Sequence, residues 1–463
     1  MKNLITLIFA FVGIVTQALA FEILTPSVVG NNMVVQRNSS AKIWGWAKAN
    51  GAVTIVADWN SADTVRVKCD ANSRFEATLE TPEAGGPYTI QIAVGGKTKV
   101  IENVMSGEVW LCGGQSNMQL SLSSTWGTKV DYHKYFSTLN NPNIRIFRVP
   151  LVGSDSEQDD CRGVWKECEG SMMENTSLAA YFFAERLQAE LGVAVGIVTS
   201  SWGGTNAEPW IAKEAIEAND DIGRSLESIK KPIKPSALYN AMIHPLVPYK
   251  FSGVIWYQGE ANVPSCGYYD SVMRSLIESW RGDFGADLPF YFAQIAPYTY
   301  SGALSGKSPY LREQQYITSH MEGCEMIVVN DLVHDIKNIH PKDKKSVGYR
   351  FADMALMRLY GVEGVDSRYP EVEGVELRGA KIVLRLSVPV VAAADGAVSG
   401  FRIAGEDGEF ADAAAKIKGN IMELSAKGIK SPKYVRYLFD DSSTCAIKGV
   451  NGLPMVPFRN DKF

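Results

Sequence analysis

The sequence lacks an excess of basic residues, and beyond its first residues it has no long apolar run. Lysine and arginine total 46 against 51 aspartate and glutamate residues, so the formal net charge is −5. This balance argues against a general nucleic-acid-binding protein, because such proteins usually carry a basic face. After residue 20, no run reaches the roughly 20 apolar residues that a membrane-spanning helix needs. We therefore expect neither a nucleic-acid partner nor a membrane span in the mature chain; the sequence does not indicate an oligomeric state.

The cysteines and histidines also lack the spacing of a zinc site. No metal or other cofactor is expected. The seven cysteines are an odd number, which leaves at least one thiol unpaired within a monomer. Cys161 and Cys168 lie in a polar stretch at loop-like spacing and are the favoured pair. Cys112 lies in a predicted core strand, where a buried free thiol is expected.

Residues 1–20 have the pattern of a secretory signal sequence. Lys2 supplies a positive start, Leu4 to Val15 form a short apolar core, and Ala18-Leu19-Ala20 matches a cleavage site. A retained membrane anchor is the alternative. The signal predicts an exported protein, periplasmic or extracellular, in which disulfides are possible.

Three stretches of different texture follow the signal. Residues 22–105 and 370–463 contain short alternating strand patterns, which predict an N-terminal and a C-terminal β domain. Residues 106–365 alternate strand and helix patterns, which predicts an α/β catalytic domain with a doubly wound parallel sheet. We therefore predict a central α/β unit flanked by β-sandwich-like units. The sequence leaves open whether the two flanking units pair into one domain.

Polar candidates follow the predicted strands of the central unit, at the sheet edge where such folds place their sites. Ser116 follows the first strand, and the base that could activate it is His340. Donors for a developing oxyanion could come from the backbone N–H of Ser116, the Gly203-Gly204 turn and the Gln258 amide. These residue types predict acyl transfer from an ester.

Four sequence blocks surround these candidates: Gly114-Gln115-Ser116-Asn117-Met118, Trp202-Gly203-Gly204-Thr205, Trp256-Tyr257-Gln258-Gly259-Glu260-Ala261-Asn262 and Asn338-Ile339-His340-Pro341. Three further segments lie near the C-terminus: Gly400-Phe401-Arg402-Ile403-Ala404-Gly405, Gly452-Leu453-Pro454 and Pro457-Phe458-Arg459. The four blocks, in this order and with these C-terminal segments, resemble the motifs of sialate O-acetylesterases, a family of the SGNH hydrolase superfamily.

The resemblance implies a metal-independent serine esterase that removes O-acetyl groups from sialic acid or sialoglycans through an acetyl-enzyme. It implies that Ser116 is the nucleophile and His340 the general base, with the Gly203-Gly204 turn and Gln258 in the oxyanion hole. Glu260 is expected to brace its loop rather than to act in catalysis.

The chain departs from the superfamily pattern at the residue that orients the histidine. Many SGNH hydrolases have an aspartate three residues before this histidine, but here the position is Lys337. Asp331 is favoured as the third member because it directly follows a predicted strand. Asp335, Asn338 or a backbone carbonyl are the alternatives, since a histidine base needs a partner that sets its tautomer.

Several further residues are candidates for substrate binding. Trp202 could stack on a sugar ring, with core packing as the alternative. His244 could line the pocket, or replace His340 as the base. An arginine could grip the sialic acid carboxylate in a two-pronged geometry, although a solvated helix face is the commoner role; the candidates are Arg281, Arg312 and Arg350. Lys342, Lys344 and Lys345 are expected to form a solvated face.

Two alternative functions remain open from the sequence. The first is an acetylesterase for another polysaccharide such as xylan, because related motif blocks recur among those enzymes. The second is a non-catalytic glycan-binding protein whose β units carry the function. Substitution of Ser116 by alanine separates the enzyme from the binder, whereas the sequence offers no physical discriminator between the two sugars.

Overall fold

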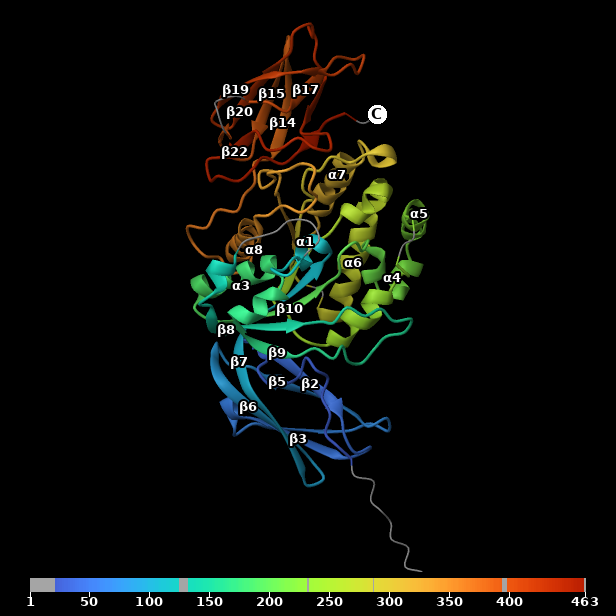
Figure 1. Cartoon of the computed structure of the whole chain (residues 1–463), viewed down its shortest axis with the longest axis vertical. Helices are drawn as coiled ribbons and strands as arrows, with labels where there is room; N and C mark the ends of the chain where they lie inside the picture. Colours follow the sequence, from blue (N-terminus) through green and yellow to red (C-terminus); the bar gives the residue numbers. More distant parts are fainter. Residues whose placement is uncertain (1–20, 125–131, 231–232, 286, 394–397, 462–463) are drawn as a thin grey trace, which may run out of the picture.

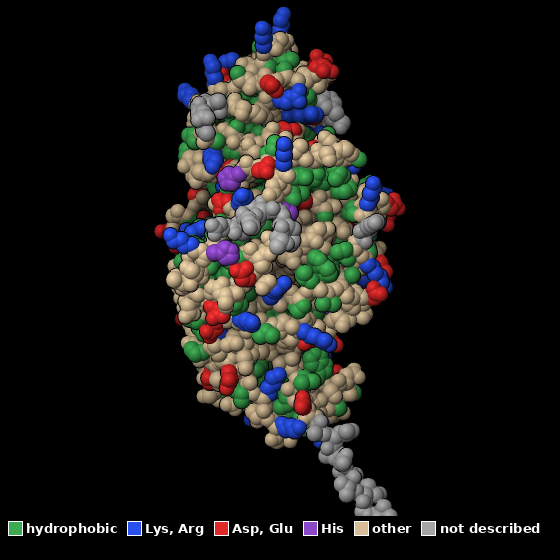
Figure 2. Space-filling model, viewed as in Figure 1, with side chains coloured by type: hydrophobic (Ala, Val, Ile, Leu, Met, Phe, Trp, Pro, Cys, Tyr) green, Lys and Arg blue, Asp and Glu red, His purple; other side chains and the backbone are tan. Residues whose placement is uncertain are grey.

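The chain forms three units in a row (Figure 1). The computed structural model describes residues 21–124, 132–230, 233–285, 287–393 and 398–461; the predicted signal sequence at 1–20 lies outside them. The two β units lie at opposite ends of the molecule, so they do not pair into one domain. Across the described ranges, no helix has the length and apolarity needed to cross a membrane. Figure 2 shows acidic and basic side chains on all three units.

The middle unit is built on a largely parallel sheet. Its strands run in the order β13-β12-β11-β7-β10-β8-β9, and β9 is antiparallel to β8 at one edge. The strands are β7 (Lys97–Gly114), β8 (Asn140–Arg148), β9 (Trp165–Glu169), β10 (Ala194–Ser201), β11 (Gly253–Tyr257), β12 (Phe290–Ala293) and β13 (Cys324–Ile327). The central strands β10 and β11 are buried along their whole length, as expected for a sheet covered on both faces.

Helices cover both faces of this sheet, with α3 and α8 on one side and α6 on the other (Figure 1). Ser177 caps α3 by accepting a hydrogen bond from the Ala180 N–H, and Gly192 ends it in the left-handed conformation. The α-helices are α1 (Ser116–Gln119), α2 (His133–Phe136), α3 (Leu178–Leu191), α4 (Lys213–Glu217), α5 (Asp220–Ser228), α6 (Tyr269–Phe284), α7 (Ser308–Thr318) and α8 (Lys344–Arg358). The 3-10 helices are η1 (Asp58–Asn60), η2 (Gly170–Glu174), η3 (Glu208–Trp210), η5 (His244–Leu246), η6 (Glu260–Tyr268) and η7 (Gly302–Leu304), and η4 (Tyr239–Ile243) is a π-helix.

The N-terminal β unit is continuous with the central sheet. Its strands β3, β4 and β6 join the same sheet through β7, while β2 and β5 pair separately. The predicted boundary at residues 105 and 106 therefore falls inside β7, which runs without interruption from one unit into the next. The strands are β1 (Val34–Gln36), β2 (Ser40–Trp46), β3 (Ala52–Ala57), β4 (Thr64–Lys68), β5 (Arg74–Glu80) and β6 (Gly85–Val94).

The C-terminal β unit has a hydrophobic core of its own. Side chains such as Ile382, Leu384, Phe401 and Met422 pack there, separately from the larger core of the other two units. The strands are β14 (Val372–Arg378), β15 (Lys381–Leu386), β16 (Val390–Ala392), β17 (Phe401–Ala404), β18 (Ala411–Asp412), β19 (Ala414–Lys418), β20 (Ile421–Ser425), β21 (Tyr434–Tyr437), β22 (Ile447–Gly449) and β23 (Phe458–Arg459).

The favoured disulfide between Cys161 and Cys168 is not present. All seven cysteines are free thiols, and both members of this pair are buried. Cys168 lies on β9 while Cys161 lies in the loop before it, so the short spacing in sequence does not bring the sulfurs together. Burial raises the pKa of both thiols to about 12, which keeps them protonated.

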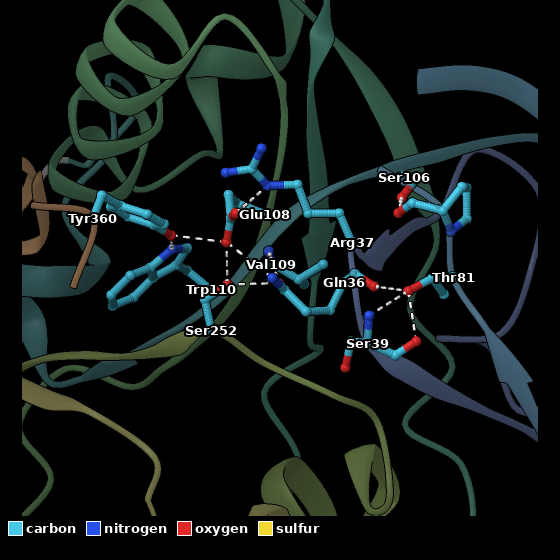
Figure 3. A network of polar contacts seen from close by, with 11 residues as sticks. Gln36, Arg37, Ser39, Thr81, Ser106, Glu108, Val109, Trp110, Ser252 and Tyr360 are labelled. Carbon is cyan, nitrogen blue, oxygen red and sulfur yellow. Dashed lines mark hydrogen bonds and ion pairs between the residues drawn. The ribbon is translucent and has the colours of Figure 1, made fainter. Parts of the chain in front are cut away.

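A buried carboxylate joins the first two units (Figure 3). Glu108 on β7 is only 3% exposed, and it accepts hydrogen bonds from Arg37 Nε at 2.6 Å and from Tyr360 OH at 2.8 Å. Gln36 Nε2 at 3.0 Å and the Ser252 hydroxyl also donate to it. The four donors come from three separate segments of the chain, so this one side chain fixes the relative positions of those segments.

We predict that Glu108→Gln lowers the free energy of unfolding by about 3–5 kcal/mol, because it removes the buried charge that four partly buried donors share. The substituted amide would also point N–H groups at those donors. Denaturant unfolding followed by tryptophan fluorescence measures the loss.

The matched control is Glu76→Gln on β5 of the N-terminal β unit. Glu76 pairs with Lys42 at 3.0 Å, but both side chains are about 40% exposed, so the expected loss is at most about 1 kcal/mol. Equal losses in the two variants would contradict the structural role of Glu108.

Candidate active site

The turn that presents Ser116 depends on Gly114 at the end of β7. Gly114 has φ 135°, and a Cβ atom there would lie 2.2 Å from the Tyr257 carbonyl oxygen of β11. Only glycine fits this approach. The chain then turns, the Gln115 N–H donates to the same carbonyl at 2.9 Å, and Ser116 begins the short helix α1.

The structure brings His340 to Ser116, from 224 residues away in the sequence. His340 Nε2 lies 2.9 Å from Ser116 Oγ. His340 lies in the segment between β13 and α8, where its backbone N–H donates to Asn338 Oδ1 at 3.0 Å. Burial, with a smaller effect of the Lys344 charge, lowers the pKa of His340 to about 4. The imidazole is therefore neutral at pH 7 and can accept the serine proton.

A buried polar network lies beside this pair. Asn117 Nδ2 donates to Glu260 Oε1 at 2.6 Å and to the Ile339 carbonyl at 3.1 Å, next to His340. Lys344 Nζ donates to Asn117 Oδ1 at 2.7 Å and lies 5.2 Å from the Tyr257 ring centroid. Burial raises the pKa of the Glu260 carboxyl and lowers that of Lys344 to about 7. The network holds α1 against the histidine segment, and Glu260 braces its loop as expected.

The prediction of a solvated face at Lys344 is wrong, since this side chain is fully buried. The helical period of α8 already indicates this burial in the sequence. Lys344 shares a stripe with the buried residues Val347, Gly348 and Phe351, three, four and seven positions further along the chain.

Ser116 and His340 open into a cavity of about 670 Å³. This volume is in the range of small-molecule sites. Trp202, half-buried after β10, lines the cavity together with Leu151 and Ile339. Trp210 and Trp256, in contrast, are fully buried against each other in the core.

Two of the predicted oxyanion donors are already engaged elsewhere. Gln258 is fully buried, and its amide nitrogen donates to the Thr205 carbonyl at 3.2 Å and to Asn262 Oδ1 at 2.8 Å. Its role is therefore to brace the loops, which corrects the prediction. The Gly203 N–H donates to Gln119 Oε1 at 2.7 Å. The backbone N–H groups of Ser116 and Gly204, both in the cavity lining, remain as candidates.

Asp331 is held by cations rather than by the histidine. Arg350 donates to both of its oxygens at 2.7 Å, and Lys448 Nζ lies 2.9 Å away. Burial alone would raise the pKa of Asp331, but these two cations hold it below its usual value. The expectation that Asp331 orients His340 is corrected: its carboxylate joins α8 to the C-terminal β unit.

The other predicted binding residues lie outside the cavity lining. His244 contacts the Gln158 carbonyl at 3.0 Å and Glu157 at 3.3 Å, so it neither lines the pocket nor replaces His340. Arg281 donates to the carbonyls of Leu288 and Glu322, and Arg312 donates to that of Asp440. These arginines, like Arg350, serve the fold.

Within the described residues, no group of histidine, cysteine, aspartate or glutamate side chains is arranged to hold a metal ion.

Comparisons with known proteins agree with the motifs. A profile of the family described as "Carbohydrate esterase, sialic acid-specific acetylesterase" matches residues 106–357. The chain is 28% identical over 425 residues to a sialate O-acetylesterase of Mus musculus, covering 78% of each protein. It is 29% identical over 404 residues to that of Homo sapiens, covering 78% of this chain and 76% of the human protein.

A solved structure is similar over nearly the whole chain. The crystal structure of a carbohydrate acetylesterase from Xanthomonas citri superposes with a TM-score of 0.85 at 31% identity, covering 96% of this chain and all of that one. The chain therefore belongs to the sialic acid-specific acetylesterase family of carbohydrate esterases, and it is a carboxylic ester hydrolase.

Proposed function

We propose that the protein is an exported serine esterase of the SGNH type that removes O-acetyl groups from sialic acid. The observation that carries this proposal is the 2.9 Å approach of His340 Nε2 to Ser116 Oγ at the floor of a cavity. The signal-like pattern of residues 1–20 supports export to a periplasm or the extracellular space.

In the first step, Ser116 Oγ attacks the acetyl carbonyl while its proton passes to His340 Nε2. A bond forms between Oγ and the carbonyl carbon, and the negative charge moves to the carbonyl oxygen. The Ser116 and Gly204 backbone N–H groups stabilise this oxyanion. When the bond to the sugar oxygen breaks, His340 returns the proton to that oxygen and an acetyl-enzyme remains.

In the second step, a water molecule takes the place of the sugar hydroxyl. His340 accepts a proton from the water, which attacks the acetyl carbon, and acetate leaves as Ser116 regains its proton. The low pKa of His340 keeps the imidazole neutral before each attack.

Sialic acid acetylated on its glycerol side chain is the favoured substrate. The curated mammalian relatives are named sialate O-acetylesterases, whereas the Xanthomonas citri protein is named more broadly as a carbohydrate acetylesterase. Acetylated xylan is the competing substrate.

We predict that Ser116→Ala lowers kcat/KM for 4-nitrophenyl acetate by about 10⁴-fold or more, because nucleophile and base act as one unit. Ser228→Ala, at an exposed serine of α5, is the control and keeps full activity. A serine-reactive phosphonate should label the wild type and the control but not Ser116→Ala. Retained activity in Ser116→Ala would favour a glycan-binding protein.

We predict an acidic limb of kcat/KM near pH 4, because protonation of His340 removes the base and its pKa is about 4. Lys344→Met removes a positive charge that disfavours the imidazolium, so the limb should move to higher pH. Lys342→Met, at an exposed lysine of the same segment, should leave it in place. An acidic limb at the same pH in Lys344→Met and in the wild type would contradict an effect of the Lys344 charge on His340.

We predict a higher kcat/KM for acetate release from O-acetylated sialic acid than from acetylated xylan oligosaccharides. Acetate is measured enzymatically with both substrates at equal acetyl concentration, and Ser116→Ala gives the background. A preference for xylan would overturn the sialic acid assignment while leaving the esterase chemistry intact.

A further inference from the structure

A second, polar cavity adjoins the catalytic one. It has a volume of about 190 Å³, and Gln119 and Leu151 line both cavities. Arg148, the last residue of β8, lines the second cavity only. A ligand could therefore reach from Ser116 past Leu151 to Arg148.

Sheet geometry sets the separation of the two ends of this site. Ser201 at the end of β10 pairs with Gly114 of β7, and Thr199 of β10 pairs with Arg148 of β8. Two strand spacings of about 4.8 Å place the ends of β7 and β8 about 10 Å apart along one sheet edge. That distance is comparable to the length of a nine-carbon sugar acid.

The charge of the second cavity favours an anion. Its other lining residues include the hydroxyl or amide side chains of Ser121, Ser123, Ser124 and Asn175, and none is acidic. Arg148 is exposed, and in the part of the chain that the structure describes its guanidinium forms no ion pair. The arginines of the earlier prediction, in contrast, are engaged by carbonyls or by Asp331.

We propose that Arg148 binds the carboxylate of the sugar acid while the O-acetyl group at the other end of the molecule reaches Ser116. The inference rests on the proposed function and names its specificity determinant. A guanidinium donates two parallel hydrogen bonds to a carboxylate, and the serine hydroxyls complete the polar wall. In sialic acid the carboxylate and the glycerol side chain are carried by the two carbons that flank the ring oxygen. With these two groups at Arg148 and Ser116, the ring lies between them, beside Leu151 and Trp202 of the cavity lining. A neutral xylan leaves Arg148 unused.

The test compares O-acetylated sialic acid with its carboxyl methyl ester, which differs in this one charge. In the wild type, kcat/KM for the acid should exceed that for the methyl ester by about 10- to 100-fold, chiefly through KM. Arg148→Gln should remove this preference, and Arg148→Lys should restore part of it. Arg66→Gln, at an exposed arginine of β4, is the control and should keep both the activity and the preference.

Equal kcat/KM values for the acid and the methyl ester in the wild type would overturn the proposal even if no variant folds. A preference that persists in Arg148→Gln would also overturn it. Wild-type hydrolysis of 4-nitrophenyl acetate separates this failure from that of the proposed function: an active esterase without acid preference refutes only the Arg148 subsite. Loss of hydrolysis altogether refutes the esterase assignment.

Discussion

The close contact between Gly114 and the Tyr257 carbonyl is the constraint on which the site depends. It lets β7 pair with β11 to its very end and then release the chain into the turn that carries Ser116. The same strand extends back into the N-terminal β unit, where it pairs with β1 and β6. One continuous backbone therefore links a peripheral β unit, the central sheet and the turn with Ser116, and the Glu108 network holds this strand between the two units.

The electrostatics around Ser116 follow from burial. A half-buried imidazole next to Lys344 resists protonation, which keeps it available as a base. Lys344 is itself buried, and its hydrogen bond to Asn117 and its position against the Tyr257 ring replace part of its lost hydration. Asn117 in turn donates a hydrogen bond to Glu260, so the segments after β7, β11 and β13 meet in one buried cluster.

The C-terminal β unit is joined to the middle unit by ion pairs and hydrogen bonds. Lys448 of β22 shares Asp331 with Arg350 of α8. Asp441 accepts hydrogen bonds from the Ser308 hydroxyl at 2.7 Å and from the Gly306 N–H at 2.6 Å, at the start of α7. Asp331, which was predicted as the third catalytic residue because it directly follows a strand, thus has a structural role, because cations from two units pair with its carboxylate.

The sequence by itself determined the alternation of strands and helices, the β texture of both flanking regions and the two residues that meet at 2.9 Å, Ser116 and His340. Those features rest on periodicity and on local motifs, which are properties of neighbouring residues. Only the tertiary structure decided what the polar side chains contact. Lys344 is buried, Gln258 donates to Asn262 in the following loop, Asp331 pairs with Arg350, and Arg148 lines a cavity. The physical reason is that the sequence specifies the type of each side chain, whereas its hydrogen-bond partners and its desolvation depend on which other segments fold against it. For Lys344 the partner is Asn117, which is 227 residues away in the sequence.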